Sequence, residues 1–292
     1  MEYDMPLFRP PSEARSLIFQ VTLGCSWNKC LFCDMYKTKK FLMRPFEELE
    51  KDVVEMSRSY PETKRIFMAD GDALAAPVDH ILKVLELMNQ RFPNLKRIST
   101  YASPKNLKDL TLEELKMFKE RKLDILYMGI ETGNDELLKK IKKGASGKQM
   151  IEVGKKAIEA GLRMSTFIIL GLGGVEGSYA HAKDSARVVN GIDPQFLATL
   201  TLMLEDEKVY EEKIMGGGFK LIDMRQSLQE LRWFVEDLEL TNCKFGTEHA
   251  SNYLSISKTA LPEDKEKILS LIDRALKDSS SGLLRPEWAR GL

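Results

Sequence analysis

Cysteine and histidine are scarce in this chain, which has four cysteines and three histidines in 292 residues. Only four cysteines in a chain of this length, three of them clustered, are not the pattern of a disulfide framework. An excess of charge of one sign is also missing, because 44 Lys and Arg balance 44 Asp and Glu. Without a basic excess there is no general attraction to nucleic acid or to an anionic membrane, so we expect no DNA partner.

Long hydrophobic runs are absent as well. No stretch approaches the roughly 18 consecutive apolar residues that a membrane helix needs, so we predict no membrane span. The first residues, MEYDMP, have neither the basic region nor the apolar segment of a secretory signal. Reduced thiols together with no export signal predict a cytoplasmic protein.

Three of the four cysteines nevertheless lie within nine residues, at Cys25, Cys30 and Cys33. A [4Fe–4S] cluster is usually held by four thiolates, one on each iron. Three closely spaced thiolates leave one iron without a protein ligand, and such an iron can chelate S-adenosylmethionine for reductive cleavage. Zinc is the alternative, because Cys30 and Cys33 have C-x2-C spacing and Cys243 or His249 could complete a tetrahedron.

Short β-rich runs alternate with helical patterns along most of the chain. They predict six strands, at 16–23, 64–69, 95–101, 124–130, 162–170 and 194–202. The fourth and fifth runs are almost continuously apolar, as expected of parallel strands that are buried on both faces. The pattern predicts an α/β fold with one parallel sheet, either a partial barrel or a doubly wound sheet.

The expected organisation has three parts. Residues 1–15 form an N-terminal arm, 16–202 the parallel-sheet core, and 203–292 a mainly helical C-terminal extension. Within the extension we expect a long loop at 203–224, followed by helices near 225–238 and 262–276.

Polar and glycine residues follow the predicted strands, at the positions where each strand ends. The cysteine loop follows the first strand, Asp70-Gly71-Asp72 the second and Tyr101 ends the third, while Glu131 and Gly171 follow the fourth and fifth. In parallel barrels the chemistry lies at the carboxyl ends of the strands. We therefore expect these residues to gather at one rim.

With these motifs the chain resembles the radical S-adenosylmethionine (SAM) enzymes from about Ser16 to Leu202. It is most similar to the branch of oxygen-independent coproporphyrinogen oxidases, methylthiotransferases and elongator-type enzymes. The family's cluster motif is C-x3-C-x-aromatic-C; here Phe32 precedes Cys33, and four residues separate Cys25 from Cys30. The resemblance implies a partial (βα)6 TIM-like barrel that binds a [4Fe–4S] cluster and SAM.

The resemblance also implies roles for residues at the methionine end of SAM. Asp70, Gly71 and Asp72 resemble the glycine-rich turn that holds the methionine amino group, with Asp72 in place of the more frequent glutamate. Glu131, in the sequence Gly-Ile-Glu-Thr-Gly-Asn-Asp, is expected to hydrogen-bond the cofactor. Lys143 is expected to neutralise its carboxylate, although a lysine near a helix C-terminus is also ordinary dipole matching.

At the nucleoside end, the turn that begins at Gly171 is expected to let the backbone pass close to the adenine. Relatives often place a ribose-binding Asp four residues before this glycine, where this chain has Phe167. The ribose hydroxyls are therefore assigned to Ser165 or Tyr101.

The resemblance implies that SAM is cleaved to a 5′-deoxyadenosyl radical, which abstracts hydrogen from a substrate. The additional domains of methylthiotransferases and the N-terminal extension of coproporphyrinogen oxidases are not visible. We therefore expect a small molecule, lipid or cofactor precursor as substrate. The alternatives are RNA or peptide modification, and a non-catalytic Fe–S chaperone or carrier of the same fold.

Other groups carry weaker expectations. A flavodoxin- or ferredoxin-type reductant is expected as partner, and a basic stretch of Lys37, Lys39, Lys40 and Arg44 follows the cluster loop. Such a stretch is by default a solvated face. His249 is either a structural histidine or a substrate contact. Cys243 is either inert or a hydrogen donor to a substrate radical.

Overall fold

The computed structural model describes residues 1–204, 206–257, 259–278 and 282–291. The chain divides into two compact units, one of Met1–Met128 with Lys156–Met164 and one of Gly129–Lys155 with Ser165–Leu292. Its eight-stranded sheet has the order β1-β4-β5-β6-β7-β8-β9-β10 and is mostly parallel. The predicted α/β class is confirmed.

In the first unit, β4 pairs in parallel with β1 on one side and with β5 on the other, and β5 pairs with β6. The strands are β1 (Leu17–Gln20), β2 (Thr22–Leu23), β3 (Leu42–Met43), β4 (Arg65–Ala69), β5 (Arg97–Tyr101) and β6 (Leu123–Glu131). The helices are η1 (Pro11–Glu13), α1 (Phe46–Ser59), η2 (Ala73–Ala75), α2 (Val78–Arg91), α3 (Pro104–Asp109) and α4 (Leu112–Glu120).

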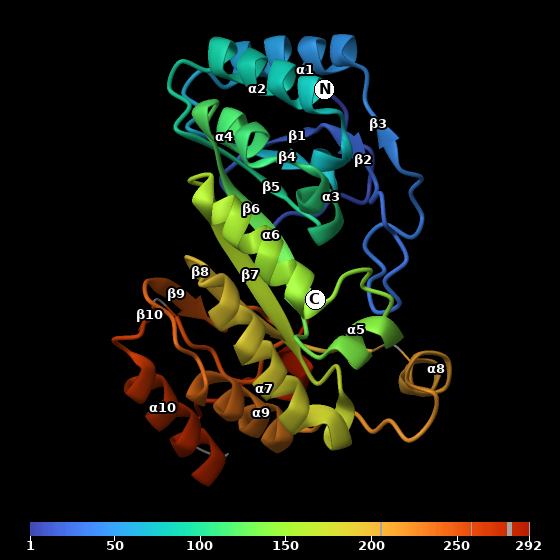
Figure 1. Cartoon of the computed structure of the whole chain (residues 1–292), viewed down its shortest axis with the longest axis vertical. Coiled ribbons are helices and arrows are strands. Elements are labelled where there is room, and N and C mark those ends of the chain that lie inside the picture. Colours follow the sequence, from blue (N-terminus) through green and yellow to red (C-terminus); the bar gives the residue numbers. More distant parts are fainter. Residues whose placement is uncertain (205, 258, 279–281, 292) are drawn as a thin grey trace. The chain divides into compact units, whose positions relative to one another are not determined.

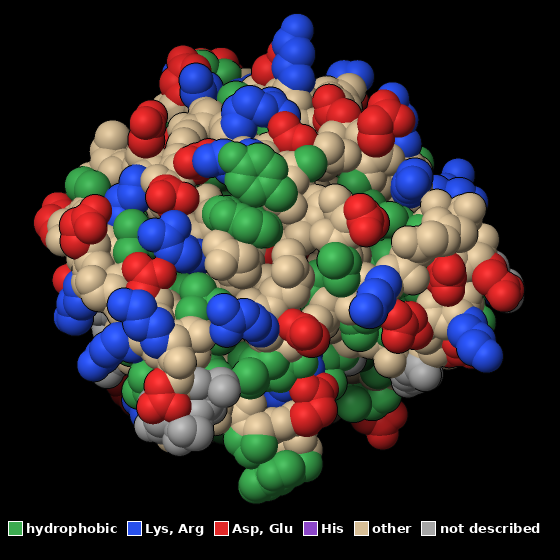
Figure 2. All heavy atoms as spheres, turned by 90° about the horizontal axis from the view of Figure 1, so that it is seen from below, with side chains coloured by type: hydrophobic (Ala, Val, Ile, Leu, Met, Phe, Trp, Pro, Cys, Tyr) green, Lys and Arg blue, Asp and Glu red, His purple; other side chains and the backbone are tan. Residues whose placement is uncertain are grey.

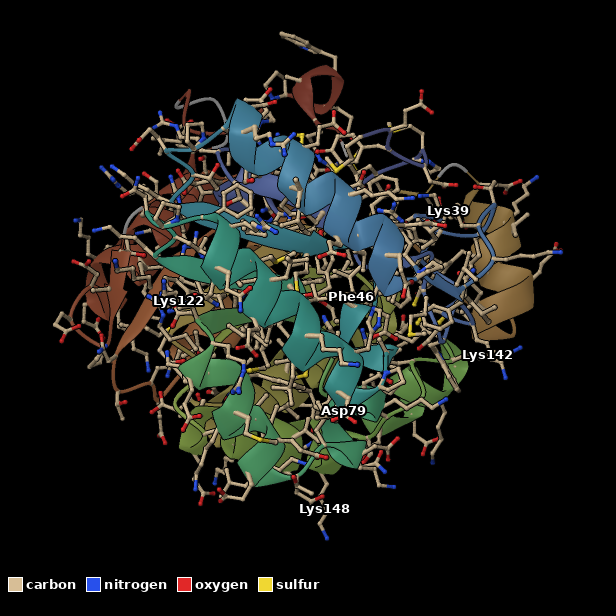
Figure 3. The ribbon with its side chains drawn as sticks, turned by 90° about the horizontal axis from the view of Figure 1, so that it is seen from above. Lys39, Phe46, Asp79, Lys122, Lys142 and Lys148 are labelled. Atoms are coloured by element: carbon tan, nitrogen blue, oxygen red, sulfur yellow. The ribbon has the colours of Figure 1, made fainter. Side chains whose placement is uncertain are left out.

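Local sequence explains how these helices begin and where they pack. Thr111 and Glu114 form a capping box at the start of α4, with each side chain bonded to the other residue's backbone N–H. α1 and α2 lie side by side (Figure 1). Phe46, labelled in Figure 3, begins α1 and meets His80 of α2 edge-on, with 6.5 Å between ring centroids.

The second unit continues from the end of β6, and α6 and β7 have residues in both units. Its strands are β7 (Arg163–Leu170), β8 (Phe196–Thr201), β9 (Cys243–Gly246) and β10 (Thr259–Leu261). Its helices are α5 (Asp135–Lys140), α6 (Gly147–Glu159), α7 (Gly174–Ile192), α8 (Glu207–Tyr210), η3 (Glu211–Met215), α9 (Met224–Glu236), α10 (Lys265–Lys277) and η4 (Glu287–Ala289). α9 packs against both α7 and α10 (Figure 1).

The C-terminal region differs from the sequence expectation in two ways. It contributes two strands to the sheet, β9 parallel to β8 and β10 antiparallel to β9. The segment 203–224, expected as a loop, contains α8 and η3. Both strands are shorter than five residues, too short for an alternating pattern to stand out. The division into arm, core and extension stays a prediction.

The surface reflects the balanced composition. Lys and Arg side chains alternate with Asp and Glu side chains over the face shown in Figure 2, without a broad patch of one sign. Among the described helices, none is both long and apolar enough to cross a bilayer.

Candidate functional site

The three clustered cysteines lie in a loop of the first unit, between two short paired strands. β2 and β3 pair antiparallel, so residues 24–41 form an excursion between them. Cys25, Cys30 and Cys33 are half-buried and free of disulfides. Half-buried cysteine side chains can be reached by a group that binds from outside the hydrophobic core.

Side-chain bonds to the backbone shape this loop. Lys37 donates from Nζ to the carbonyl oxygens of Asn28 (2.9 Å) and Cys30 (2.8 Å). Asn28 in turn donates from Nδ2 to the carbonyl oxygen of Tyr36, at 2.8 Å. The bonds hold the backbone around Cys30 without using any thiol.

The base of the loop is fixed by Asp70, which follows β4 and is fully buried. Its Oδ2 accepts from the backbone N–H of Gly24 at 3.0 Å and from Lys39 Nζ at 2.8 Å, and its Oδ1 accepts from Gln20 Nε2 at 3.0 Å. Both carboxylate oxygens are thus used by protein donors. Asp70 thus holds the cysteine loop, and its expected contact with the cofactor stays a prediction.

Lys39, labelled in Figure 3, departs from the expected solvated basic face. Its ammonium is almost fully buried and pairs with Asp70 and with Asp4, at 2.8 and 2.9 Å. Arg44 is likewise engaged, with its guanidinium 2.8 Å from Asp52. Only Lys37 and Lys40 of the basic stretch are exposed.

Gly71 brings the turn after β4 against the cysteine loop. Its N–H donates to the carbonyl oxygen of Gly24 at 3.2 Å. A Cβ on Gly71 would lie 2.7 Å from Cε2 of Tyr36 and 3.3 Å from Cβ of Cys25. A residue larger than glycine would therefore displace the tyrosine ring, so the approach explains the glycine.

Asp72 is buried and joins the cysteine loop to the start of α3. Its carboxylate accepts hydrogen bonds from Ser26 Oγ and from Asn106 Nδ2. Burial raises its pKa to about 6, against the opposing effect of these bonds. Asn106 was not anticipated from the sequence; its position one turn into α3, after the Ser103 cap, is the only signal.

Tyr101 ends β5 and packs edge-on against Phe67, with 5.2 Å between ring centroids. Burial raises the pKa of its phenol far above the ordinary value, so the hydroxyl stays protonated. A protonated phenol can both donate and accept a hydrogen bond, as a ribose contact requires.

A single-ion metal site finds no support in the part of the chain that the structure describes. No three His, Cys, Asp or Glu side chains group there as ligands of one ion. A zinc site needs its ligands within about 2.0–2.3 Å of one ion. In an iron–sulfur cluster each thiolate binds its own iron, so Cys25, Cys30 and Cys33 need not converge. The donor set fits a cluster better than zinc.

In the second unit the structure brings Glu131 and Lys143 together. Lys143 donates from Nζ to Glu131 Oε1 at 2.7 Å. Glu131 Oε2 is buried, and no described residue offers it a hydrogen bond. Burial raises the pKa of this carboxyl, and Lys143 opposes the rise. An unpartnered buried carboxylate oxygen is a costly feature, which a bound donor would satisfy.

The backbone around Glu131 is shaped to admit this carboxylate. Glu131 has a φ of +65°, in the left-handed region that a residue with a Cβ seldom adopts. A Cβ on Gly129 would lie 1.9 Å from Glu131 Oε1, so only glycine leaves room at that position. Strained backbone of this kind concentrates at functional sites.

Ser165 and Gly171 belong to the strand and turn that follow. Ser165 and Phe167 are half-buried and alternate with buried residues along β7, so both lie on the same face. Gly171 has a φ of +87°, and its N–H donates to Glu230 Oε1 at 2.7 Å. The contacts hold the turn; the nucleoside roles of Ser165 and Gly171 stay predictions.

Behind this turn lies a buried polar network that sequence reasoning missed. Glu230 of α9 accepts from Gly171 N–H and from Ser178 Oγ, and its Oε1 lies 3.4 Å from His181 Nε2. His181 Nδ1 is 2.8 Å from Thr132 Oγ1, next to Glu131 in the chain. The sequence signal that could have revealed this network was Glu230 itself, an acid among the apolar residues of the helix predicted near 225–238.

Burial keeps both ionisable groups of this network neutral. It raises the pKa of Glu230 to about 8 and lowers that of His181 to about 4. A protonated carboxyl beside a neutral imidazole avoids an uncompensated charge in the interior.

Two remaining groups, Cys243 and His249, keep both alternatives as predictions. Cys243 is buried in β9, and burial raises the pKa of its thiol to about 12. His249 has its Nδ1 2.8 Å from Ser251 Oγ, which is the structural alternative for this histidine.

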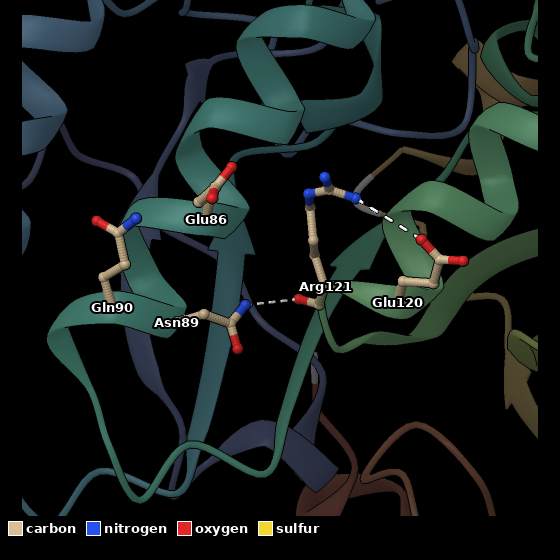
Figure 4. A pocket seen from close by; sticks show the side chains of 5 residues that line it. All are labelled: Glu86, Asn89, Gln90, Glu120 and Arg121. Atoms are coloured by element: carbon tan, nitrogen blue, oxygen red, sulfur yellow. Dashed lines mark hydrogen bonds and ion pairs between the residues drawn. The ribbon is translucent and has the colours of Figure 1, made fainter.

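A surface hollow between α2 and α4 (Figure 4) is lined by Glu86, Asn89, Gln90, Glu120 and Arg121. It holds no thiol and none of the predicted residues.

Comparison with known proteins agrees with this arrangement. The family model described as the radical SAM superfamily matches residues 19–183, more than half of the chain. The chain belongs to the radical SAM superfamily. Proteins of this superfamily bind a [4Fe–4S] cluster and SAM, as predicted.

Among curated proteins, the chain is 24% identical to "Heme chaperone HemW" of Bacillus subtilis over 218 residues, which covers 72% of this chain and 56% of that protein. It is also 24% identical to "4'-phospho-dehydrooxetanocin synthase" of Priestia megaterium, over 47% of this chain and 21% of that protein. The chain thus spans about half, or less, of the length of these relatives.

Among solved structures, the coproporphyrinogen III oxidase HemN from Escherichia coli matches with a TM-score of 0.55 and 18% identity, over 76% of this chain and 51% of that one. TsrM from Kitasatospora setae, solved with cobalamin and a [4Fe–4S] cluster, matches with a TM-score of 0.52 and 14% identity, over 65% and 37%. These likenesses show the shared partial-barrel fold.

We predict that Glu131→Gln weakens SAM binding about tenfold or more, because a hydrogen bond to a charged group contributes ~1.5–3 kcal/mol. Iron content should stay unchanged, since no thiolate is removed. Isothermal titration of the reconstituted protein with SAM measures the affinity. The matched control is Glu136→Gln, an exposed acid on α5 paired with Lys139. Equal affinities for Glu131→Gln and the wild type would remove Glu131 from the site.

We predict that stability falls as pH rises from about 6.5 to 8, because folded Glu230, with its pKa of about 8, keeps a proton that the unfolded chain releases. Below about pH 6.5 His181 opposes this slope, since its lowered pKa makes the unfolded chain bind the extra proton. The slope is at most about 1.4 kcal/mol per pH unit. Glu230→Gln should flatten it in urea unfolding, whereas Glu239→Gln, an exposed acid, should not. A slope that survives unchanged in Glu230→Gln would show that Glu230 is not its source.

Proposed function

We propose that this chain is a radical SAM enzyme in which the thiolates of Cys25, Cys30 and Cys33 hold the [4Fe–4S] cluster. The single observation that carries the proposal is the cysteine loop itself. Its three cysteines form no disulfide and are half-buried, and its base is fixed by a buried carboxylate, within the matched family region. When bound, the cluster and SAM supply one-electron cleavage of the C5′–S bond, and the 5′-deoxyadenosyl radical abstracts hydrogen from the substrate.

The chain's own residues prepare this chemistry. Asp70 and Lys39 hold the loop, so the thiolates need little reorganisation when the cluster binds. Asp72, with Ser26, ties the turn after β4 to the same loop. Lysine has three donor hydrogens, so Lys143 can pair with Glu131 and still neutralise the methionine carboxylate.

Glu131 is the strongest candidate for the contact with the methionine part of SAM. Its free Oε2 needs a donor, which a SAM hydroxyl or ammonium group would provide. We assign Tyr101 or Ser165 to the ribose and the turn at Gly171 to the adenine on the family resemblance. Gly71 lies close to Cys25, which supports the proposal that its turn holds the methionine amino group beside the cluster.

The reductant is proposed as an acidic flavodoxin- or ferredoxin-type protein. Two lysines lie close to the ring of Trp27 in the cysteine loop. Nζ of Lys29, in the same loop, is 5.0 Å from the ring centroid, and Nζ of Lys105, on α3, is 5.3 Å from it. Lys37 adds an exposed ammonium to the loop. The substrate stays a prediction: a small molecule, lipid or cofactor precursor is expected, with RNA or a peptide as the alternative. The cytoplasmic location also stays a prediction.

A second candidate function is a haem chaperone without radical chemistry. The observation in its favour is the match to HemW, a protein named as a haem chaperone, over 72% of this chain. The two functions share the cluster and differ in whether SAM is cleaved.

One experiment tests the assignment and separates the two functions. Anaerobic reconstitution should give about four irons per chain; Cys25→Ala, Cys30→Ala and Cys33→Ala should each lose the cluster, and the control Cys243→Ala should keep it. With dithionite and SAM, the wild type should form 5′-deoxyadenosine slowly even without substrate. Stoichiometric zinc in place of iron would contradict the cluster. An intact cluster without 5′-deoxyadenosine would favour the chaperone.

A further inference from the structure

Tyr36, three residues after the last clustered cysteine, has a buried hydroxyl without a hydrogen-bond partner among the described residues. The residue is 4% exposed. A buried tyrosine hydroxyl usually finds a partner, because an unsatisfied polar group loses its bonds to water without replacement. Phenylalanine would fill the same space at no such cost. The hydroxyl therefore calls for a partner that the polypeptide does not supply.

The ring of Tyr36 lies close to the side chain of Cys25, on the other side of Gly71. The position that a Cβ of Gly71 would occupy is 2.7 Å from Cε2 of Tyr36 and 3.3 Å from Cβ of Cys25. Tyr36 and Cys25 thus border the same small space above the glycine.

The ring is also held in place from its other sides. Phe8 meets it edge-on, with 5.5 Å between ring centroids. The Lys39 ammonium, bound to Asp70, lies 5.8 Å from the ring centroid. A side chain fixed in this way keeps its hydroxyl at a defined position relative to the loop.

The surroundings of the hydroxyl are those of a proton donor. Burial raises the pKa of Tyr36 far above its ordinary value, and electrostatic interaction with Asp70, Tyr101 and the two cysteines Cys25 and Cys33 adds to the rise. The phenol therefore keeps its proton.

We propose that the Tyr36 hydroxyl donates a hydrogen bond to a sulfur atom of the cluster site formed by Cys25 and Cys33, and so raises its reduction potential. The inference rests on the proposed function. A hydrogen bond to cluster sulfur stabilises the reduced state, which carries one more negative charge, and is one of the protein's controls over potential. Tyr36 would make the cluster easier to reduce by the electron carrier.

The test is an EPR-monitored redox titration of the reconstituted protein in the absence of SAM. Tyr36→Phe removes only the hydroxyl, so we expect a midpoint potential shifted to a more negative value with iron content unchanged. Tyr179→Phe is the matched control, because this tyrosine lies on α7 and is 54% exposed. The cluster of the Tyr179→Phe variant should have the midpoint potential of the wild type. If Tyr36→Phe fails to hold iron, Tyr36→Met supplies a second side chain without a donor and should show the same shift.

An unshifted potential in a Tyr36 variant with an intact cluster would overturn this inference and leave the proposed function standing. An unshifted potential with weaker SAM binding would also overturn it, by assigning the hydroxyl to the cofactor. A wild-type chain that assembles no cluster would overturn the proposed function and this inference together.

Discussion

The buried carboxylate of Asp70 is the interaction on which the cysteine loop depends. It receives the Gly24 backbone N–H at the start of the loop and the Lys39 ammonium near its end. A buried charge without a partner is expensive, and removing one member of a buried ion pair costs about 3–5 kcal/mol. Asp70 therefore fixes both ends of the segment that carries the three cysteines.

Buried acids in the second unit follow the same rule in two different ways. Glu131 is compensated by Lys143 and keeps one oxygen unsatisfied, as a group prepared for a ligand would. Among the described residues, Glu230 lies beside His181, which burial keeps neutral, and has no ion pair with Lys or Arg, so it retains its proton. The first acid is suited to binding, and the second holds the Gly171 turn in place.

The sequence predicted the features that depend on local pattern. The cysteine spacing and the six strands are written in short stretches of chain, and the structure contains each of them. Glu131 and Lys143 were each predicted to contact the cofactor, and the ion pair between them is a finding of the structure.

Features that depend on distant partners could not be predicted. Lys39 reads as one of several exposed lysines, and only the folded position of Asp70 buries it. Glu230 reads as an ordinary helix acid until Gly171 and Ser178 are placed beside it. The two short C-terminal strands owe their conformation to β8, because three or four residues carry too weak a pattern to specify a strand.

The most direct test of the central claim is the EPR spectrum of the dithionite-reduced protein, recorded before and after SAM is added. If three thiolates leave one iron open, SAM binds that iron and shifts the g-values of the reduced cluster. A signal that SAM leaves unchanged, in protein with a full complement of iron, would contradict a three-cysteine cluster with an open site.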